Sequence, residues 1–74
     1  MGGETISNEI RRLRFEHNEM TQAELAERIN VTRQTVNAIE QGKYSPSLEV
    51  AFKIAEVFGK PLEQVFRYQP ARKR

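Results

Sequence analysis

The sequence predicts an all-α domain built from five short helices. Apolar residues recur at spacings of three and four along most of the 74 residues. This spacing is the period of an amphipathic helix, and no stretch shows the sustained alternation of a strand. A hydrophobic content of 38% suits one small domain at this length. We therefore expect a single unit over residues 1–74, with its core at about 7–66 and a loosely ordered tail at 67–74.

The first two helices are predicted from their apolar spacing and their start signals. Apolar residues that share one stripe predict a helix over about residues 7–17. Thr21 and Glu24 then have the spacing of a capping box, in which the two side chains bond each other's backbone N–H groups. The second helix is therefore expected over about residues 22–29.

The third helix is predicted to follow after about three residues. Asn30 tolerates the left-handed backbone that a tight turn requires. Thr32 offers a hydroxyl that can cap a helix over about residues 33–41. Gly42 supplies the signal that ends this helix.

Two more helices complete the predicted domain. Ser47 is placed to cap a fourth helix, which is apolar nearly all round and ends at Gly59. Pro61 opens a short fifth helix. A helix that is apolar all round lies either at the centre of the core or at an interface shared with a partner.

The composition excludes most enzymatic and metal chemistry. The chain has no Cys, all ten acidic residues are Glu, and His17 is the one histidine. It therefore lacks the residues for a disulfide framework, a thiolate zinc site or a hydrolytic triad. We expect no enzyme activity, no metal and no cofactor. No apolar run approaches the roughly 18 residues of a membrane span, and the N-terminus shows no signal-peptide pattern. We therefore expect a cytoplasmic protein with no membrane partner.

The positive charge is concentrated at one end of the chain. The formal net charge is +2, and Arg67, Arg72, Lys73 and Arg74 supply four of the 12 basic residues. Residues 1–66 consequently hold eight basic residues against ten glutamates. Any affinity for nucleic acid must therefore come from a local patch and not from the overall balance.

Residues 22–41 have the pattern of a helix-turn-helix. Two short helices are joined by a turn of about three residues, so they must cross steeply. Ala26 is the small residue that such a crossing needs, and Val31 is an apolar residue that can hold the turn against the core. In this motif the second helix enters the major groove of DNA, with its N-terminal residues aimed at base edges.

The motifs of the chain form a specific set when they are taken together. They are TQAELAERINVTRQTVNAIEQGKYSPSLEVAFKIAEVFG, with LR before it and PLEQVF after it. Over about residues 7–66 this set resembles the Cro-like and phage-repressor family, often called Xre-type regulators. The resemblance implies a compact five-helix, lambda-repressor-like DNA-binding domain. Members are usually repressors or activators, commonly dimeric on inverted-repeat operators. We therefore expect a repressor that binds specific double-stranded DNA, with residues 33–41 in the major groove.

Carried over to this chain, the resemblance implies a DNA-facing surface around the third helix. The residues implied to face bases are Arg33, Gln34, Thr35 and Ala38. Those implied to lie at the sugar-phosphate backbone are Gln22, Thr32, Asn37, Lys43 and Tyr44. Arg can fork onto guanine and Gln onto adenine, whereas the alternative for Arg33 and Gln34 is an ordinary solvated surface. The alternative for Lys43 is an interaction with the helix dipole.

The resemblance also implies an ion pair beneath this surface. Arg14 and Glu40 match a family pair that ties the first helix to the third. The segment between Arg14 and the second helix is one residue longer than is usual in the family, which leaves Arg11 as the alternative partner of Glu40. Asn30 stands where the family usually has a turn glycine.

The apolar surface of the fourth and fifth helices predicts a homodimer, because five short helices cannot hide it all. The residues assigned to the interface are Val50, Ile54, Val57, Val65, Phe66 and Tyr68. The basic residues 72–74 serve either solubility or phosphate binding. A second class of function stays open, a protein-interaction module such as an antitoxin, whose main partner is a toxin or another protein.

Overall fold

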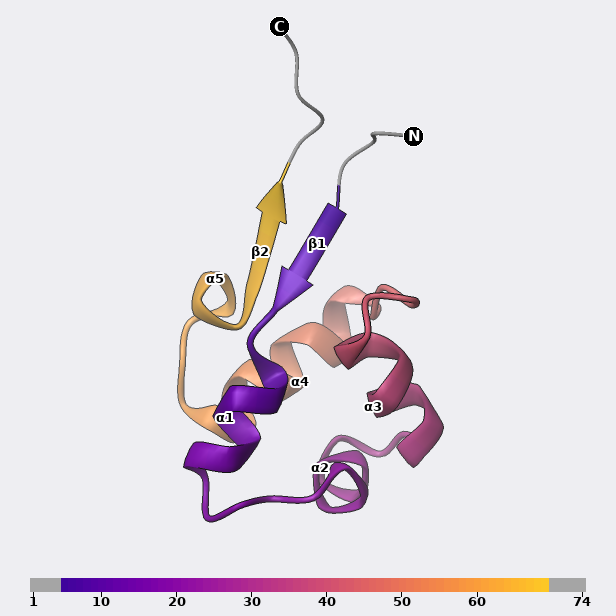
Figure 1. The fold of residues 1–74 in the computed structure, drawn as a ribbon, viewed down its shortest axis with the longest axis vertical. Coiled ribbons are helices and arrows are strands. Elements are labelled where there is room, and N and C mark those ends of the chain that lie inside the picture. The colour runs from indigo at the N-terminus through magenta and orange to yellow at the C-terminus, as the bar shows by residue number, and fades with distance from the viewer. Residues whose placement is uncertain (1–4, 70–74) are drawn as a thin grey trace, which may run out of the picture.

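The structure, a computed structural model, describes residues 5–69. Its elements in chain order are β1 (Thr5–Asn8), α1 (Ile10–Glu16), α2 (Gln22–Ile29), α3 (Arg33–Glu40), α4 (Leu48–Phe58), α5 (Leu62–Val65) and β2 (Phe66–Gln69). The five helices gather at one end of the molecule, and β1 and β2 extend from them side by side (Figure 1). Within residues 5–69, no helix is long and apolar enough to cross a membrane.

Within residues 5–69 the five expected helices are present, and two strands make the fold mostly helical and not strictly all-α. β1 pairs antiparallel with β2, so that Ile6 lies opposite Tyr68 and Asn8 lies opposite Phe66. Residues 67–69, expected in a loosely ordered tail, are therefore part of a strand, and residues 70–74 lie outside the described part of the chain. Each strand has only four residues, which is too short to show a clear period of two, and its partner comes from the other end of the sequence.

The side chain of Asn8 explains why α1 begins at Ile10 and not at the expected residue 7. Its Oδ1 accepts a hydrogen bond from the backbone N–H of Ile10 at 3.1 Å, and its Nδ2 donates to the carbonyl of Ile39 at 2.9 Å. These bonds hold the end of β1 against α3. The chain can therefore turn into a helix only after the strand ends.

The remaining helix boundaries follow the local signals in the sequence. The Thr21 side chain accepts from the N–H of Glu24, and Glu24 accepts from the N–H of Thr21, which completes the capping box. Ser47 caps α4, and Gly59 ends it with a φ of 64°. Such a positive φ is one that glycine adopts at little cost.

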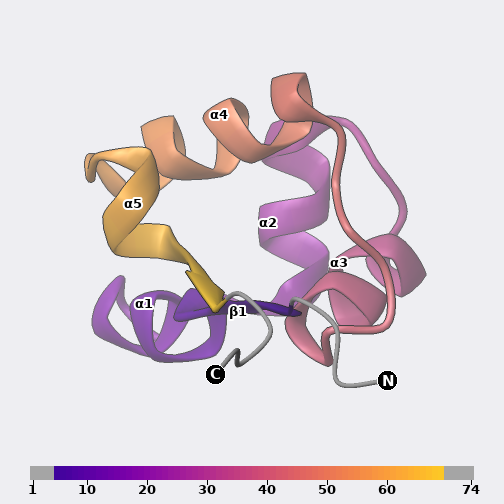
Figure 2. The ribbon, with the colours of Figure 1, turned by 90° about the horizontal axis from the view of Figure 1, so that it is seen from above.

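The core lies between the helices, with α4 packed across one side of it (Figure 2). Two residues expected at a dimer interface, Ile54 and Val65, belong to this core and are only 1% and 0% exposed. That part of the interface expectation is wrong, because Ile54 and Val65 pack into the core of their own chain and cannot contact a second copy. The exposed apolar residues of α4 are instead Leu48 at 67% and Phe52 at 54%.

Candidate nucleic-acid interface

A tight turn joins α2 to α3. Asn30 has a φ of 63° and a ψ of 48°, the left-handed conformation that Asn tolerates better than most residues. The N–H of Val31 then donates to the carbonyl of Ala26 at 3.0 Å. Thr32 caps α3, because its hydroxyl oxygen accepts from the N–H of Thr35 at 3.1 Å. These bonds fix the direction in which the first turn of α3 points.

The ion pair implied between α1 and α3 is present, and it uses Arg14. Its Nε lies 2.5 Å from Oε2 of Glu40, and its Nη2 lies 3.1 Å from Oε1 of the same carboxylate. The two side chains are only 16% and 7% exposed. Such a two-pronged geometry is the strongest form of an Arg–carboxylate contact.

The extra residue before α2 is absorbed without displacing Arg14. Asn18 and Glu19 both have positive φ values, 64° and 55°. They turn the chain so that the carbonyl of Met20 accepts a hydrogen bond from Nη1 of Arg14 at 2.7 Å. Arg11, the alternative partner of Glu40, makes no ion pair within residues 5–69.

Two residues expected at phosphates are bonded to each other. Nε2 of Gln22 donates to Oδ1 of Asn37 at 3.1 Å and to Oε1 of Glu40 at 3.2 Å. Gln41 also donates to Oδ1 of Asn37, at 3.3 Å. This network holds the N-terminus of α2 beside α3. It occupies the donor group of Gln22, whereas the amide nitrogen of Asn37 has no partner among the described residues.

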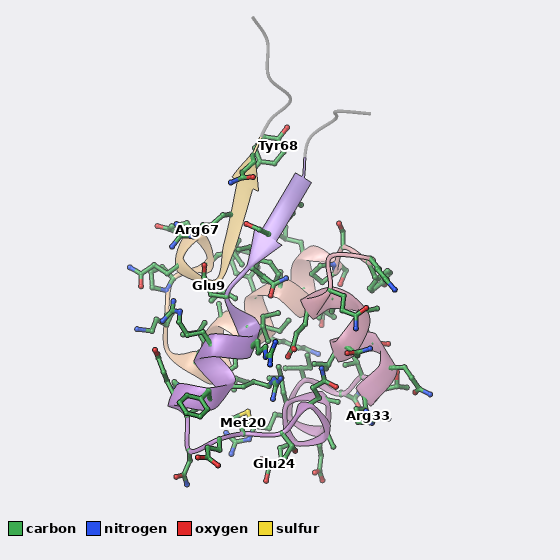
Figure 3. All side chains as sticks on the ribbon, viewed as in Figure 1. Glu9, Met20, Glu24, Arg33, Arg67 and Tyr68 are labelled. Atoms are coloured by element: carbon green, nitrogen blue, oxygen red, sulfur yellow. The ribbon has the colours of Figure 1, made fainter. Side chains whose placement is uncertain are left out.

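The first turn of α3 presents two polar side chains to solvent. Arg33 and Gln34 are exposed, and Arg33 lies on the outer side of the helix (Figure 3). Neither makes a side-chain hydrogen bond or an ion pair with another residue of the 5–69 segment. Both therefore keep their full capacity to bond a ligand.

The other two residues expected at bases sit beside the loop that follows α3. Thr35 and Ala38 are half-buried. With Gln34 and Tyr44 they line a shallow depression, and Tyr44 is 53% exposed. Tyr44 is expected at the sugar-phosphate backbone, and the structure brings it next to positions that are expected to face bases.

Glutamates in the described part of the chain engage several of its cations. Arg12 bonds to Glu9 and to Glu16 at 3.1 Å and 3.0 Å, and these two hydrogen bonds raise the pKa of its guanidinium. Nε of Arg67 lies 3.8 Å from a carboxylate oxygen of Glu9, and Figure 3 labels both residues. Nζ of Lys53 lies 3.5 Å from a carboxylate oxygen of Glu49. A phosphate at these positions would have to compete with the paired glutamates.

Arg11 and Lys43 remain available on either side of α3. Lys43 is exposed on the loop after the helix. Arg11 lines a polar depression together with Gln22, Asn37 and Gln41. The sequence-based expectation for this surface does not include Arg11, which the structure places beside it. Its spacing of three from Arg14 puts both on one face of α1, and that signal could have found it.

Comparison with known proteins gives one consistent result. A family described as helix-turn-helix matches residues 10–65. The chain is 48% identical over 64 residues to an uncharacterised HTH-type transcriptional regulator of Methanocaldococcus jannaschii, MJ0272, covering 86% of this chain and 96% of that protein. It is 39% identical over 60 residues to the phage CTXphi transcriptional repressor RstR of Vibrio cholerae, covering 81% of this chain and 53% of RstR. A solved protein of Bacteroides fragilis has the same fold, with a TM-score of 0.72 at 24% identity, covering 84% of this chain and 98% of that one.

Proposed function

The chain belongs to the Xre/Cro-like helix-turn-helix family, and on that premise we propose that it is a transcriptional regulator that binds specific sequences of double-stranded DNA. The first turn of α3 would enter the major groove. The observation that carries this proposal is the pair Arg33 and Gln34, which are exposed and have no partner among residues 5–69. An arginine can bond two acceptors of guanine, and a glutamine can bond adenine in the same way.

Contacts to the DNA backbone would flank these base contacts. Lys43 and Arg11 are the cations available on the two sides of α3. The Gln22 side chain already donates to Asn37 and Glu40 of α3. A phosphate near Gln22 would therefore accept from backbone N–H groups at the start of α2, because the first N–H groups of a helix have no acceptor within it. The free amide nitrogen of Asn37 would add a donor. Thr32 stands at the start of α3 and Tyr44 beyond its end, so both border the same surface.

A homodimer on an inverted-repeat operator is the form of binding that we propose. Apolar side chains of α4 and β2 that are half-buried or exposed support it: Val50, Val57, Phe66 and Tyr68. Two copies would then place their α3 helices about one helical turn of DNA apart, roughly 34 Å. The similarity to RstR supports repression as the regulatory outcome.

Selection of bound sequences from random duplex DNA tests this function. The purified full chain should enrich a near-palindrome whose half-site centres are about one helical turn, roughly 10 base pairs, apart. The matched control is the double variant Arg33→Ala/Gln34→Ala, which should fold normally and lose the enriched sequence. If the wild-type protein enriches no sequence, a protein-interaction function such as that of an antitoxin becomes the better account.

A further inference from the structure

The depression beside α3 is shallow and is bordered by that helix and the loop after it. It is lined by Gln34, Thr35, Ala38 and Tyr44. Gly42, at a φ of 76°, turns the chain after α3, and the N–H of Lys43 donates to the carbonyl of Ala38 at 2.9 Å. The loop therefore folds back along the helix, and this brings the Tyr44 ring next to the Ala38 position.

Tyr44 also borders a hollow on its other side. It contributes to a second hollow, which is closed by residues at the base of the two strands and the end of α3: Ile6, Asn8, Ile39 and Phe66. Asn8 in turn bonds the carbonyl of Ile39. Tyr44 thus borders hollows on two sides, and at 53% exposure it keeps open surface towards the depression beside α3.

The inner part of the depression offers little hydrogen bonding. Ala38 has no polar side-chain atom. The hydroxyl of Thr35 lies 2.9 Å from the hydroxyl of Thr32, at hydrogen-bond distance, so it is engaged within the helix cap. The methyl groups of Thr35 and Ala38 and the ring of Tyr44 together form an apolar contact surface.

We propose that this depression receives the 5-methyl group of a thymine, and that Tyr44 is a specificity-determining residue for that base. This inference rests on the proposed DNA binding. Among the bases, thymine alone presents an apolar group in the major groove, and Ala and the Thr methyl are side chains that contact it. The depression adjoins Gln34, so the thymine lies next to a base that the first turn of α3 reads.

Replacement of thymine by uracil tests the inference directly, because it removes the methyl group and leaves base pairing intact. The DNA is the sequence selected by the wild-type protein, with each thymine of a half-site replaced in turn. One replacement should weaken wild-type binding about fourfold, the effect of one buried methyl group at about 0.8 kcal/mol. Tyr44→Ala should bind the thymine and uracil versions equally, whereas Tyr44→Phe should keep the wild-type ratio because it keeps the ring.

Thr35→Ser is a second, smaller test, which keeps the inference testable if Tyr44→Ala fails to fold. Thr35→Ser removes one methyl group and keeps the hydroxyl that meets Thr32, so it should reduce the thymine-to-uracil ratio without lowering the melting temperature. The inference is overturned if no thymine is sensitive, or if Tyr44→Ala and Thr35→Ser both keep the full ratio. A protein that enriches no DNA sequence would instead remove the proposed function itself, and the two failures are therefore distinguishable.

Discussion

Arg14 and Glu40 form a nearly buried ion pair that joins α1 to the last turn of α3, with 2.5 Å between Nε and Oε2. Arg14 also bonds the carbonyl of Met20, and Glu40 also accepts from Gln22. One carboxylate therefore links three segments that must keep a fixed arrangement for α3 to face DNA. The pair is thus part of the support of the proposed reading surface.

Glu40→Ala should lower the free energy of unfolding by about 3 to 5 kcal/mol, because it leaves the Arg14 guanidinium buried without a counter-charge. Urea denaturation followed by circular dichroism measures this value. The matched control is Glu16→Ala, which removes a partner of the exposed Arg12 and should cost less than about 1 kcal/mol. Similar small losses for both variants would show that the buried pair has no special role.

The helix boundaries could be predicted from the sequence because their signals are local. Thr21 with Glu24, Thr32 and Ser47 each cap a helix through a backbone N–H three residues away or less. The paired strands could not be predicted in this way. Ile6 and Tyr68 face each other only after the whole chain has folded between them, and four-residue strands carry too little pattern of their own.

The candidate site shows the same division between local and tertiary information. The exposure of Arg33 and Gln34 follows from the helical period of α3, so the sequence was sufficient for it. The bonding of Gln22 to Asn37 and Glu40 was not predictable, because it depends on how closely α2 approaches α3. The pairing of Arg14 with Glu40 goes together with two left-handed residues in the loop between α1 and α2, Asn18 and Glu19, which no spacing rule describes.

DNA binding should depend steeply on salt, although residues 1–66 carry more acidic than basic groups. A dimer with two cationic contacts per half, Arg11 and Lys43, would give a slope of log affinity against log salt of about −4, at about 0.9 per neutralised phosphate. Arg11→Gln and Lys43→Gln should each make the slope shallower by about 2, since each acts in both copies. Titration of a labelled operator at several salt concentrations measures the slope.

Lys60→Gln is the control for this measurement, because Lys60 is an exposed cation beyond the end of α4 and should leave the slope unchanged. Deletion of residues 72–74, which lie outside the described structure, tests the basic end of the chain. An unchanged slope after that deletion assigns those residues to solubility. Unchanged slopes for both Arg11→Gln and Lys43→Gln would place the phosphate contacts elsewhere.

The protein should sediment as a dimer at concentrations of tens of micromolar. Tyr68 is exposed on β2 within the proposed interface, so Tyr68→Lys should shift the equilibrium towards monomer by placing like charges opposite each other. Tyr68→Phe is the matched control, because it keeps the aromatic ring, adds no charge and should remain a dimer. A wild-type monomer at these concentrations, both with and without DNA, would contradict the proposed dimer.

Substitutions in the first turn of α3 should separate base reading from backbone contact. Arg33→Ala should weaken binding to the selected site by about 1 to 3 kcal/mol and relax selectivity at one base pair of each half-site. Gln34→Ala should do the same at a neighbouring pair. Lys43→Ala should weaken specific and random duplexes about equally, because a phosphate contact carries no sequence information.

Val36→Ala is the control for these three variants, because Val36 is buried in the core and its truncation should lower the melting temperature and affect DNA binding only through folding. Competition between the selected duplex and random duplexes measures the specificity ratio of each variant. The assignment depends on a contrast between variants: the ratio should fall for Arg33→Ala and Gln34→Ala and stay constant for Lys43→Ala. If all three variants fold normally and keep the wild-type ratio, α3 does not read bases, and the surface around Arg33 must serve another kind of partner.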